Sequence, residues 1–144
     1  MSFVYTPAKY KIARGEIALQ SADTRVLLVM TNTTADTDQD AATISGIGTL
    51  DEYNGANYAR KAFSGEVVNE DDPNNWAEFT ADPVTWSTLG VGTRQCQAAV
   101  IYLFVTNDAD SVPIAYIDTG GFPFDGNGGN AVLTPNAEGF LKVT

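Results

Sequence analysis

The apolar stretch that decides the fold is Ala98-Ala99-Val100-Ile101-Tyr102-Leu103-Phe104-Val105. It is the longest strand signal in the chain, within a segment that runs from residue 95 to 105. A polar turn at 107–110 separates it from a second apolar segment, 112–119. Two such segments around a short turn are typical of a hairpin, in which Tyr102, Phe104 and Tyr116 serve as core or subunit contacts.

Short strand patterns continue on both sides of this hairpin. Residues 12–19 alternate with period two, and residues 26–30 are apolar on both faces, as in a central strand covered on both sides. Segments 58–63 and 67–69 flank Ser64-Gly65 and predict another hairpin. Further strands are expected at 76–80, 84–89, 131–134 and 140–143. The fold class is therefore all-β, a single antiparallel β-sandwich or barrel that is jelly-roll-like.

Two segments depart from the strand pattern. Thr37 precedes Asp40 by three residues, as in a capping box, and glycines follow at 46 and 48, so one short helix is expected near 38–45. Residues 1–11 show no clear period, and we expect an extended N-terminal arm there. The predicted organisation is the arm, 1–11, followed by a single β domain, 12–144.

The charge of the chain is strongly acidic and unevenly distributed. The 144 residues carry 18 acids and 8 bases, a net charge of −10. Such a surface repels nucleic-acid backbones and anionic membranes, so neither is expected as a partner. Four of the eight bases lie within residues 1–25, which suggests that the arm docks on something acidic, including a neighbouring copy.

Residue usage excludes several kinds of chemistry. The chain has no histidine, which rules out Ser-His-Asp and Cys-His catalysis and histidine metal sites. A single cysteine, Cys96, allows no intrachain disulfide and favours a reducing compartment of folding. It is expected to be a small buried side chain, because no histidine is present to activate it. The first residues do not have the pattern of a signal peptide, and the longest aliphatic run, 26–30, is too short to cross a bilayer. No cofactor is expected.

Three features of the sequence are candidate sites. Asp36, Asp38 and Asp40 alternate as calcium ligands do, but Ala41 and Ile47 stand where an EF-hand needs Gly and Glu, so calcium is only an alternative to a polar loop. The segment 120–130 holds five glycines together with Phe122 and Phe124, and it is interpreted equally as an irregular connection or as a contact loop for a partner protein. Paired carboxylates suited to glycan hydrolysis are disfavoured against solvated surface charge.

Most of the chain resembles small virion proteins of tailed bacteriophages. The likeness lies in residues 5–10, in the stretch 50–61 (Leu-Asp-Glu-Tyr-Asn-Gly-Ala-Asn-Tyr-Ala-Arg-Lys), and in 90–94, 98–102 and 110–115. It continues through Phe-Pro-Phe at 122–124, Gly-Asn-Gly-Gly at 126–129 and Asn-Ala-Glu-Gly at 136–139. The family patterns contain no catalytic signature.

This resemblance implies a non-enzymatic structural protein of the virion head surface, made in the cytoplasm of the host bacterium. Head decoration, or cement, proteins of this kind are often homotrimers that bind across neighbouring subunits of the major capsid protein. The expected partners are thus the capsid protein and copies of the chain itself. The residues expected to bind partners are Phe3, Tyr5, Lys9, Tyr10, Lys11, Phe122 and Phe124.

The alternatives are a neck or tail component, such as a tail-completion or fibre-attachment protein, a carbohydrate-binding module with Trp76 or Trp86 exposed, and a glycan hydrolase.

Overall fold

A computed structural model describes residues 2–143 of the chain. Its main sheet has five antiparallel strands in the order β1-β8-β7-β2-β3, with β1 at Phe3–Val4, β2 at Thr24–Met30, β3 at Lys61–Ala62, β7 at Cys96–Leu103 and β8 at Val112–Ile117. A three-stranded sheet has the order β10-β5-β4, formed by β4 (Val67–Asp71), β5 (Trp76–Thr80) and β10 (Leu141–Val143). Strands β6 (Val84–Trp86) and β9 (Ala131–Leu133) form a third sheet.

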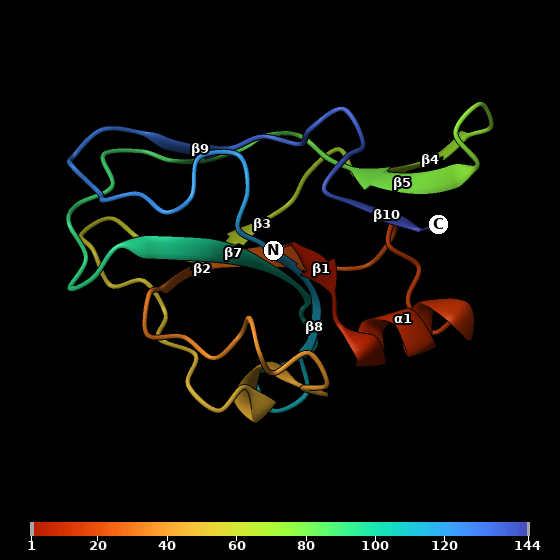
Figure 1. Ribbon diagram of the computed structural model, residues 1–144, viewed down its shortest axis with the longest axis horizontal. Coiled ribbons are helices and arrows are strands. Elements are labelled where there is room, and N and C mark those ends of the chain that lie inside the picture. Colours follow the sequence, from red (N-terminus) through yellow and green to blue (C-terminus); the bar gives the residue numbers. More distant parts are fainter. Residues whose placement is uncertain (1, 144) are drawn as a thin grey trace.

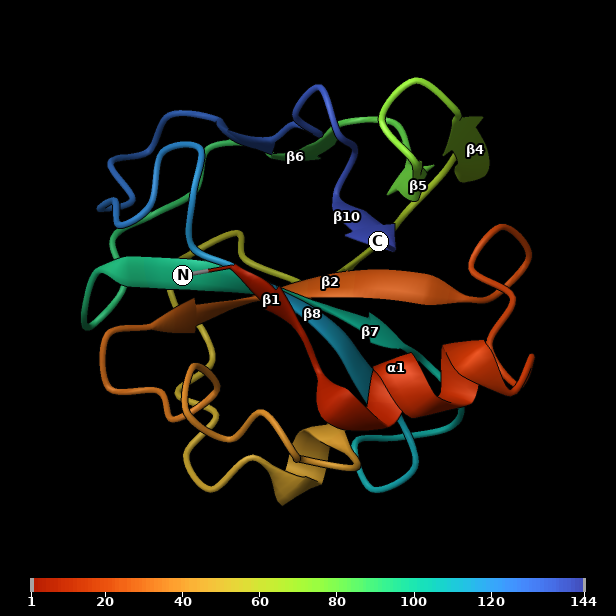
Figure 2. The same cartoon turned by 45° about the vertical axis from the view of Figure 1, so that its right-hand side comes forward.

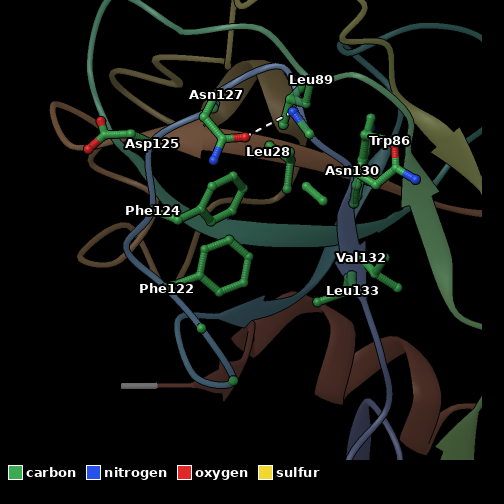
Figure 3. Close-up of a pocket in the computed structure, with 15 residues that line it drawn as sticks. Leu28, Trp86, Leu89, Phe122, Phe124, Asp125, Asn127, Asn130, Val132 and Leu133 are labelled. Carbon is green, nitrogen blue, oxygen red and sulfur yellow. Dashed lines mark hydrogen bonds between the residues drawn. The ribbon is translucent and has the colours of Figure 1, made fainter.

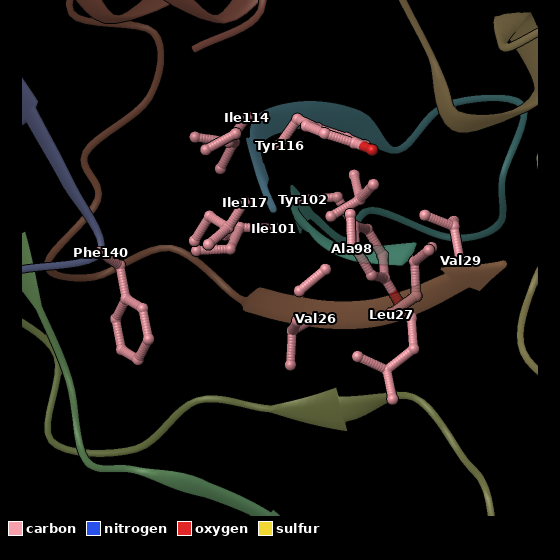
Figure 4. Close-up of a cluster of buried hydrophobic side chains, with 14 of the residues drawn as sticks. Val26, Leu27, Val29, Ala98, Ile101, Tyr102, Ile114, Tyr116, Ile117 and Phe140 are labelled. Atoms are coloured by element: carbon pink, nitrogen blue, oxygen red, sulfur yellow. The ribbon is translucent and has the colours of Figure 1, made fainter. Parts of the chain in front are cut away.

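The two central strands of the main sheet are buried on both faces, as the apolar run at 26–30 predicts. Residues 26–30 of β2 are at most 2% exposed, and their neighbours on β7 are equally buried. Figure 1 shows the reason: irregular chain around residues 31–50 covers one face, and the two small sheets with the C-terminal chain cover the other. Figure 4 shows Val26, Ile101 and Ile114 among the side chains of this core. Burying apolar surface on both faces is the main source of stability here.

The all-β prediction, with antiparallel sheets and one short helix, is confirmed. The hairpin around 107–110 is also present, since β7 pairs with β8 with Ile101 opposite Ala115. Closure into a jelly-roll-like sandwich or barrel stays a prediction, because the described strands fall into sheets of five, three and two.

The N-terminal segment differs from the extended arm that the sequence predicts. Phe3–Val4 pairs with β8, and helix α1 spans Thr6–Ala13. Proline lies in the first turn of α1, where its missing N–H costs nothing, and Gly15 follows the helix at φ 72°. Tyr5 is fully buried and donates a hydrogen bond from its hydroxyl to the Ala35 carbonyl, 2.8 Å away. Figure 2 shows α1 packed against β8 rather than projecting from the body. The strand expected at 12–19 is therefore wrong as well.

Two further local predictions are wrong. The helix expected at 38–45 is replaced by a loop that contains only a 3₁₀ turn, Ile44–Gly46, because Asp38 accepts hydrogen bonds from Thr34 Oγ1 (2.6 Å) and Gly48 N (2.8 Å) instead of capping a helix. The segments around Ser64-Gly65 do not pair with each other, since β3 pairs with β2 and β4 pairs with β5. The chain passes there from the main sheet to the second sheet, and Phe63 anchors the crossing in the core.

Candidate functional site

The glycine-rich segment forms one wall of an open cleft of about 300 Å³. Its other wall is β9 with the residues just before it, and Leu28, Trp86 and Leu89 form the apolar lining between the walls (Figure 3). Phe122 and Phe124 lie on the first wall, with ring centroids 5.6 Å apart. The cleft has an apolar lining with a few polar groups, which is the usual composition of a small binding site.

The base of the glycine-rich segment is fixed by backbone pairing. Phe124 and Cys96 exchange two backbone hydrogen bonds, of 2.8 and 3.0 Å, at the start of β7. Gly128 N donates to Leu89 O and Leu89 N donates to Gly129 O, both at 2.8 Å. The cleft is therefore built before any partner arrives, which lowers the entropy lost on binding.

Glycine at 126 is required by a close approach of three loops. A Cβ at this position would lie 2.1 Å from the Gly90 carbonyl oxygen and 2.3 Å from the Tyr53 hydroxyl. That hydroxyl donates a 2.7 Å hydrogen bond to the same carbonyl. The loops around 53, 90 and 126 consequently pack backbone to backbone at the foot of the cleft.

Polar groups at the rim are few and mostly neutral. Asn127 Oδ1 accepts a hydrogen bond from Gly129 N (2.9 Å), and Asn130 Oδ1 accepts one from Thr88 N (3.0 Å). Asp125 is the one charged side chain in the lining, and it accepts a 2.9 Å hydrogen bond from Gln95 Nε2. The cleft offers apolar contact and amide groups, and it presents no nucleophile beside a base.

The structure brings some of the predicted partner-binding residues together and separates others. Phe122 and Phe124 share the cleft just described. Phe3 and Lys9 border a second hollow of about 430 Å³, between the N-terminal segment and β10, where Glu138 and Lys142 form an ion pair of 2.7 Å. The prediction that Tyr5 contacts a partner is wrong, because this side chain is part of the core and is not accessible for docking.

The remaining predicted contacts lie on α1. Tyr10 is 57% exposed, and Lys11 pairs with Glu16 at 3.3 Å. Arg14, on the same turn, also pairs with Glu16 and extends over the Tyr10 ring. Glu16 thus partly neutralises the positive charge of the N-terminal segment, although the ring of Tyr10 stays accessible.

Glu52 and Asp108 form a pair of carboxylates that has a structural role. Arg60 binds Glu52 through Nε and Nη2, at 2.8 and 2.7 Å, and binds Asp108 through its other N–H groups. These bonds lower the pKa of Asp108 and raise the pKa of Arg60. Tyr58 donates a further 2.8 Å hydrogen bond to Glu52. Both carboxylates are committed to one guanidinium, which leaves neither poised as a general acid. The Glu52–Tyr58–Arg60 cluster lies in the stretch 50–61, where no sequence pattern indicates an ion cluster.

The other candidate residues are placed in structural roles. Cys96 is fully buried, and burial raises the pKa of its thiol to about 12. Trp86 is 1% exposed and donates its indole N–H to Ala59 O, while Lys142 Nζ lies 4.3 Å from the ring centre of the half-buried Trp76. Neither tryptophan offers the open stacking surface that the carbohydrate-binding alternative requires.

The described residues include neither a metal-binding cluster nor a membrane-spanning helix. Within residues 2–143, no group of three or more Cys, Asp or Glu side chains is arranged to hold a metal ion, and Asp38 of the acidic run is engaged by Thr34 and Gly48. In the same part of the chain, no helix is long and apolar enough to cross a membrane.

Comparisons with known proteins found no match for this chain among family models, curated proteins or solved structures.

Proposed function

We propose that the protein is a non-enzymatic structural component of a bacteriophage virion, a capsid decoration protein that binds neighbouring subunits of the major capsid protein. The observation that carries the proposal is the preformed cleft between the glycine-rich segment and β9. Two phenylalanines and a single carboxylate, Asp125, line this cleft. A site of this composition is suited to holding a protein segment rather than to transforming a substrate. The assignment to a bacteriophage virion rests on the resemblance of the sequence to small virion proteins.

The mechanism is burial of many identical contacts over a symmetric shell. Each cleft contributes a modest interface, and the homotrimer that the resemblance implies would engage several capsid subunits at once. The second contact then occurs at high effective concentration, so weak single contacts give a firm attachment. The acidic surface keeps the free protein soluble and away from the packaged nucleic acid.

The test is the copy number of the chain in purified virions, measured against the major capsid protein by quantitative mass spectrometry. A number of the same order as the capsid protein is expected. A few copies per particle would instead assign the chain to the neck or tail, and absence from the virion would overturn the proposal. Native mass spectrometry of the purified protein tests the trimer.

A further inference from the structure

The unpaired edge of β9 borders the cleft. β9 pairs with β6 along one edge only, with Val132 opposite Thr85. Beyond that ladder, the backbone of Ala131–Leu133 makes no hydrogen bond within residues 2–143. Figure 3 shows the cleft between this strand and the wall that carries Phe122 and Phe124. An unpaired strand edge is a template for another strand, because its N–H and C=O groups require partners.

From these features we infer that the cleft binds an extended, non-acidic peptide segment of the partner, which adds to β9 as a third strand of the β6–β9 sheet. The segment pairs its backbone with β9 and directs every second side chain into the cleft between Phe122, Phe124 and Leu133. Three residues of β9 extend over about 10 Å, which is enough for a short segment of three or four residues. This inference rests on the proposed function only in assigning the segment to the major capsid protein.

The chemistry of the segment follows from the two sides of the strand it joins. Leu133 is 7% exposed and faces the interior, whereas Val132 is 54% exposed. The inward positions of the segment therefore require apolar side chains of moderate size. The outward positions lie near Asp125, on a protein of net charge −10, so they favour lysine or arginine and reject acids.

The free edge of β4 is a weaker candidate for the same partner. Its residues 67–70 are exposed on the protruding β4–β5 hairpin, with Val67 41% and Val68 40% exposed. None of the hollows between the N-terminal segment, β9 and β10 is lined by residues 67–70, and Gln20 Oε1 already accepts a hydrogen bond from Val68 N. Of the two edges, only β9 borders the cleft that Phe122 and Phe124 line.

The experiment titrates the ¹⁵N-labelled protein with the blocked pentapeptide Lys-Val-Lys-Val-Lys and follows amide shifts. We expect shifts centred on residues 120–133. A peptide methylated on alternate backbone nitrogens cannot complete the ladder and should bind about tenfold more weakly. The peptide Glu-Val-Glu-Val-Glu should bind more weakly still. Equal binding of the methylated peptide, shifts centred on β4, or absence of binding by the lysine peptide would overturn the inference.

A matched pair of variants separates this inference from the proposed function. Val132→Lys places a cation at the cleft, and Val105→Lys makes the same change at a valine of 53% exposure in the β7–β8 loop. Val132→Lys should lower the affinity for the lysine peptide about tenfold, and Val105→Lys should leave this affinity unchanged. In virions, Val132→Lys should lose occupancy while Val105→Lys keeps it. Full occupancy of both variants would overturn the inference and leave the decoration role standing, whereas wild-type protein absent from virions would overturn the role alone.

Discussion

Two irregular segments cover the central sheet, and they use their polar groups in opposite ways. In the segment 31–60, buried or half-buried polar side chains are satisfied within the protein: Asp38 by Thr34 and Gly48, and Glu52 by Tyr58 and Arg60. In the segment 118–134, backbone anchors hold the base while the edge of β9 and the rings of Phe122 and Phe124 border an opening. The first segment stabilises the fold, and the second lines the candidate site. The cleft and the unpaired edge of β9 are therefore what make the segment 118–134 the candidate site.

The largest expected effect comes from removing the contact that joins the N-terminal segment to the segment 31–60. Tyr5→Ala deletes a fully buried ring and its hydrogen bond to Ala35 O, and should lower the free energy of unfolding by about 3–5 kcal/mol. Tyr10→Ala, on the same helix but 57% exposed, should change it by less than about 0.5 kcal/mol. Urea denaturation measures both. Equal effects would mean that residues 1–11 behave as the extended arm after all.

The next effect concerns the ion cluster that ties the segment 31–60 to the β7–β8 loop. Arg60→Met leaves Glu52 and Asp108 close together without their shared cation, and should lower the unfolding free energy by about 2–4 kcal/mol. Arg14→Met is the control, because that side chain is 57% exposed in its pair with Glu16 and should contribute less than about 1 kcal/mol. The peptide affinity of the cleft should not change in either variant. A loss of binding in Arg60→Met would show that the two segments are coupled.

A smaller effect is expected at the foot of the cleft. Gly126→Ala forces a methyl group against Gly90 O and should cost about 1–3 kcal/mol while moving the loops around 53 and 90. Gly120→Ala meets no atom within 4 Å and carries only the strain of its φ of 74°, so its amide shifts should stay local. Shifts confined to residue 126 and its neighbours would argue against the three-loop junction.

The parts of the fold that the sequence predicts are those with a period or a long apolar run. β2, β7 and β8 follow directly from such runs, and the turn between β7 and β8 follows from its polar residues. Helix α1 differs from the extended arm predicted at 1–11, although Tyr5, Ala8 and Ile12 are spaced three and four residues apart and proline is favoured in the first turn of a helix. That spacing was the available signal.

The candidate site was predictable only in part. Glycines and aromatic residues at 120–130 indicate equally an irregular connection or a contact loop, and the structure places Phe122 and Phe124 in a cleft. The opposite wall is β9, a three-residue strand whose free edge depends on which strands pair, and local sequence does not encode that pairing. The Arg60 cluster likewise joins residues 52, 60 and 108, which are brought together only by the tertiary fold.

The smallest expected effect is a loss of stability at acidic pH, caused by protonation of three carboxylates. Hydrogen bonds from Arg94 hold the pKa of Asp51 below its ordinary value, and those from Arg60 and Thr34 do the same for Asp108 and Asp38. All three carboxylates belong to or contact the segment 31–60. A lowered folded-state pKa stabilises the protein fully above the unfolded pKa of about 3.9, and this contribution is lost as the pH falls through the lower folded value. The urea midpoint should therefore stay level between about pH 7 and 5 and fall below about pH 4.

Two substitutions attribute this acid loss to the segment 31–60. Asp108→Asn should lower stability at pH 7 and reduce the further loss between pH 7 and 3, because the amide has no proton to gain. Asp72→Asn, at an exposed turn residue whose side chain makes no ion pair or hydrogen bond within residues 2–143, should keep the wild-type difference. If Asp108→Asn lost as much stability between pH 7 and 3 as the wild type, the ionised Glu52–Arg60–Asp108 cluster would not be what holds the segment 31–60 on the sheet. The contrast with the segment 118–134 would then rest on packing alone.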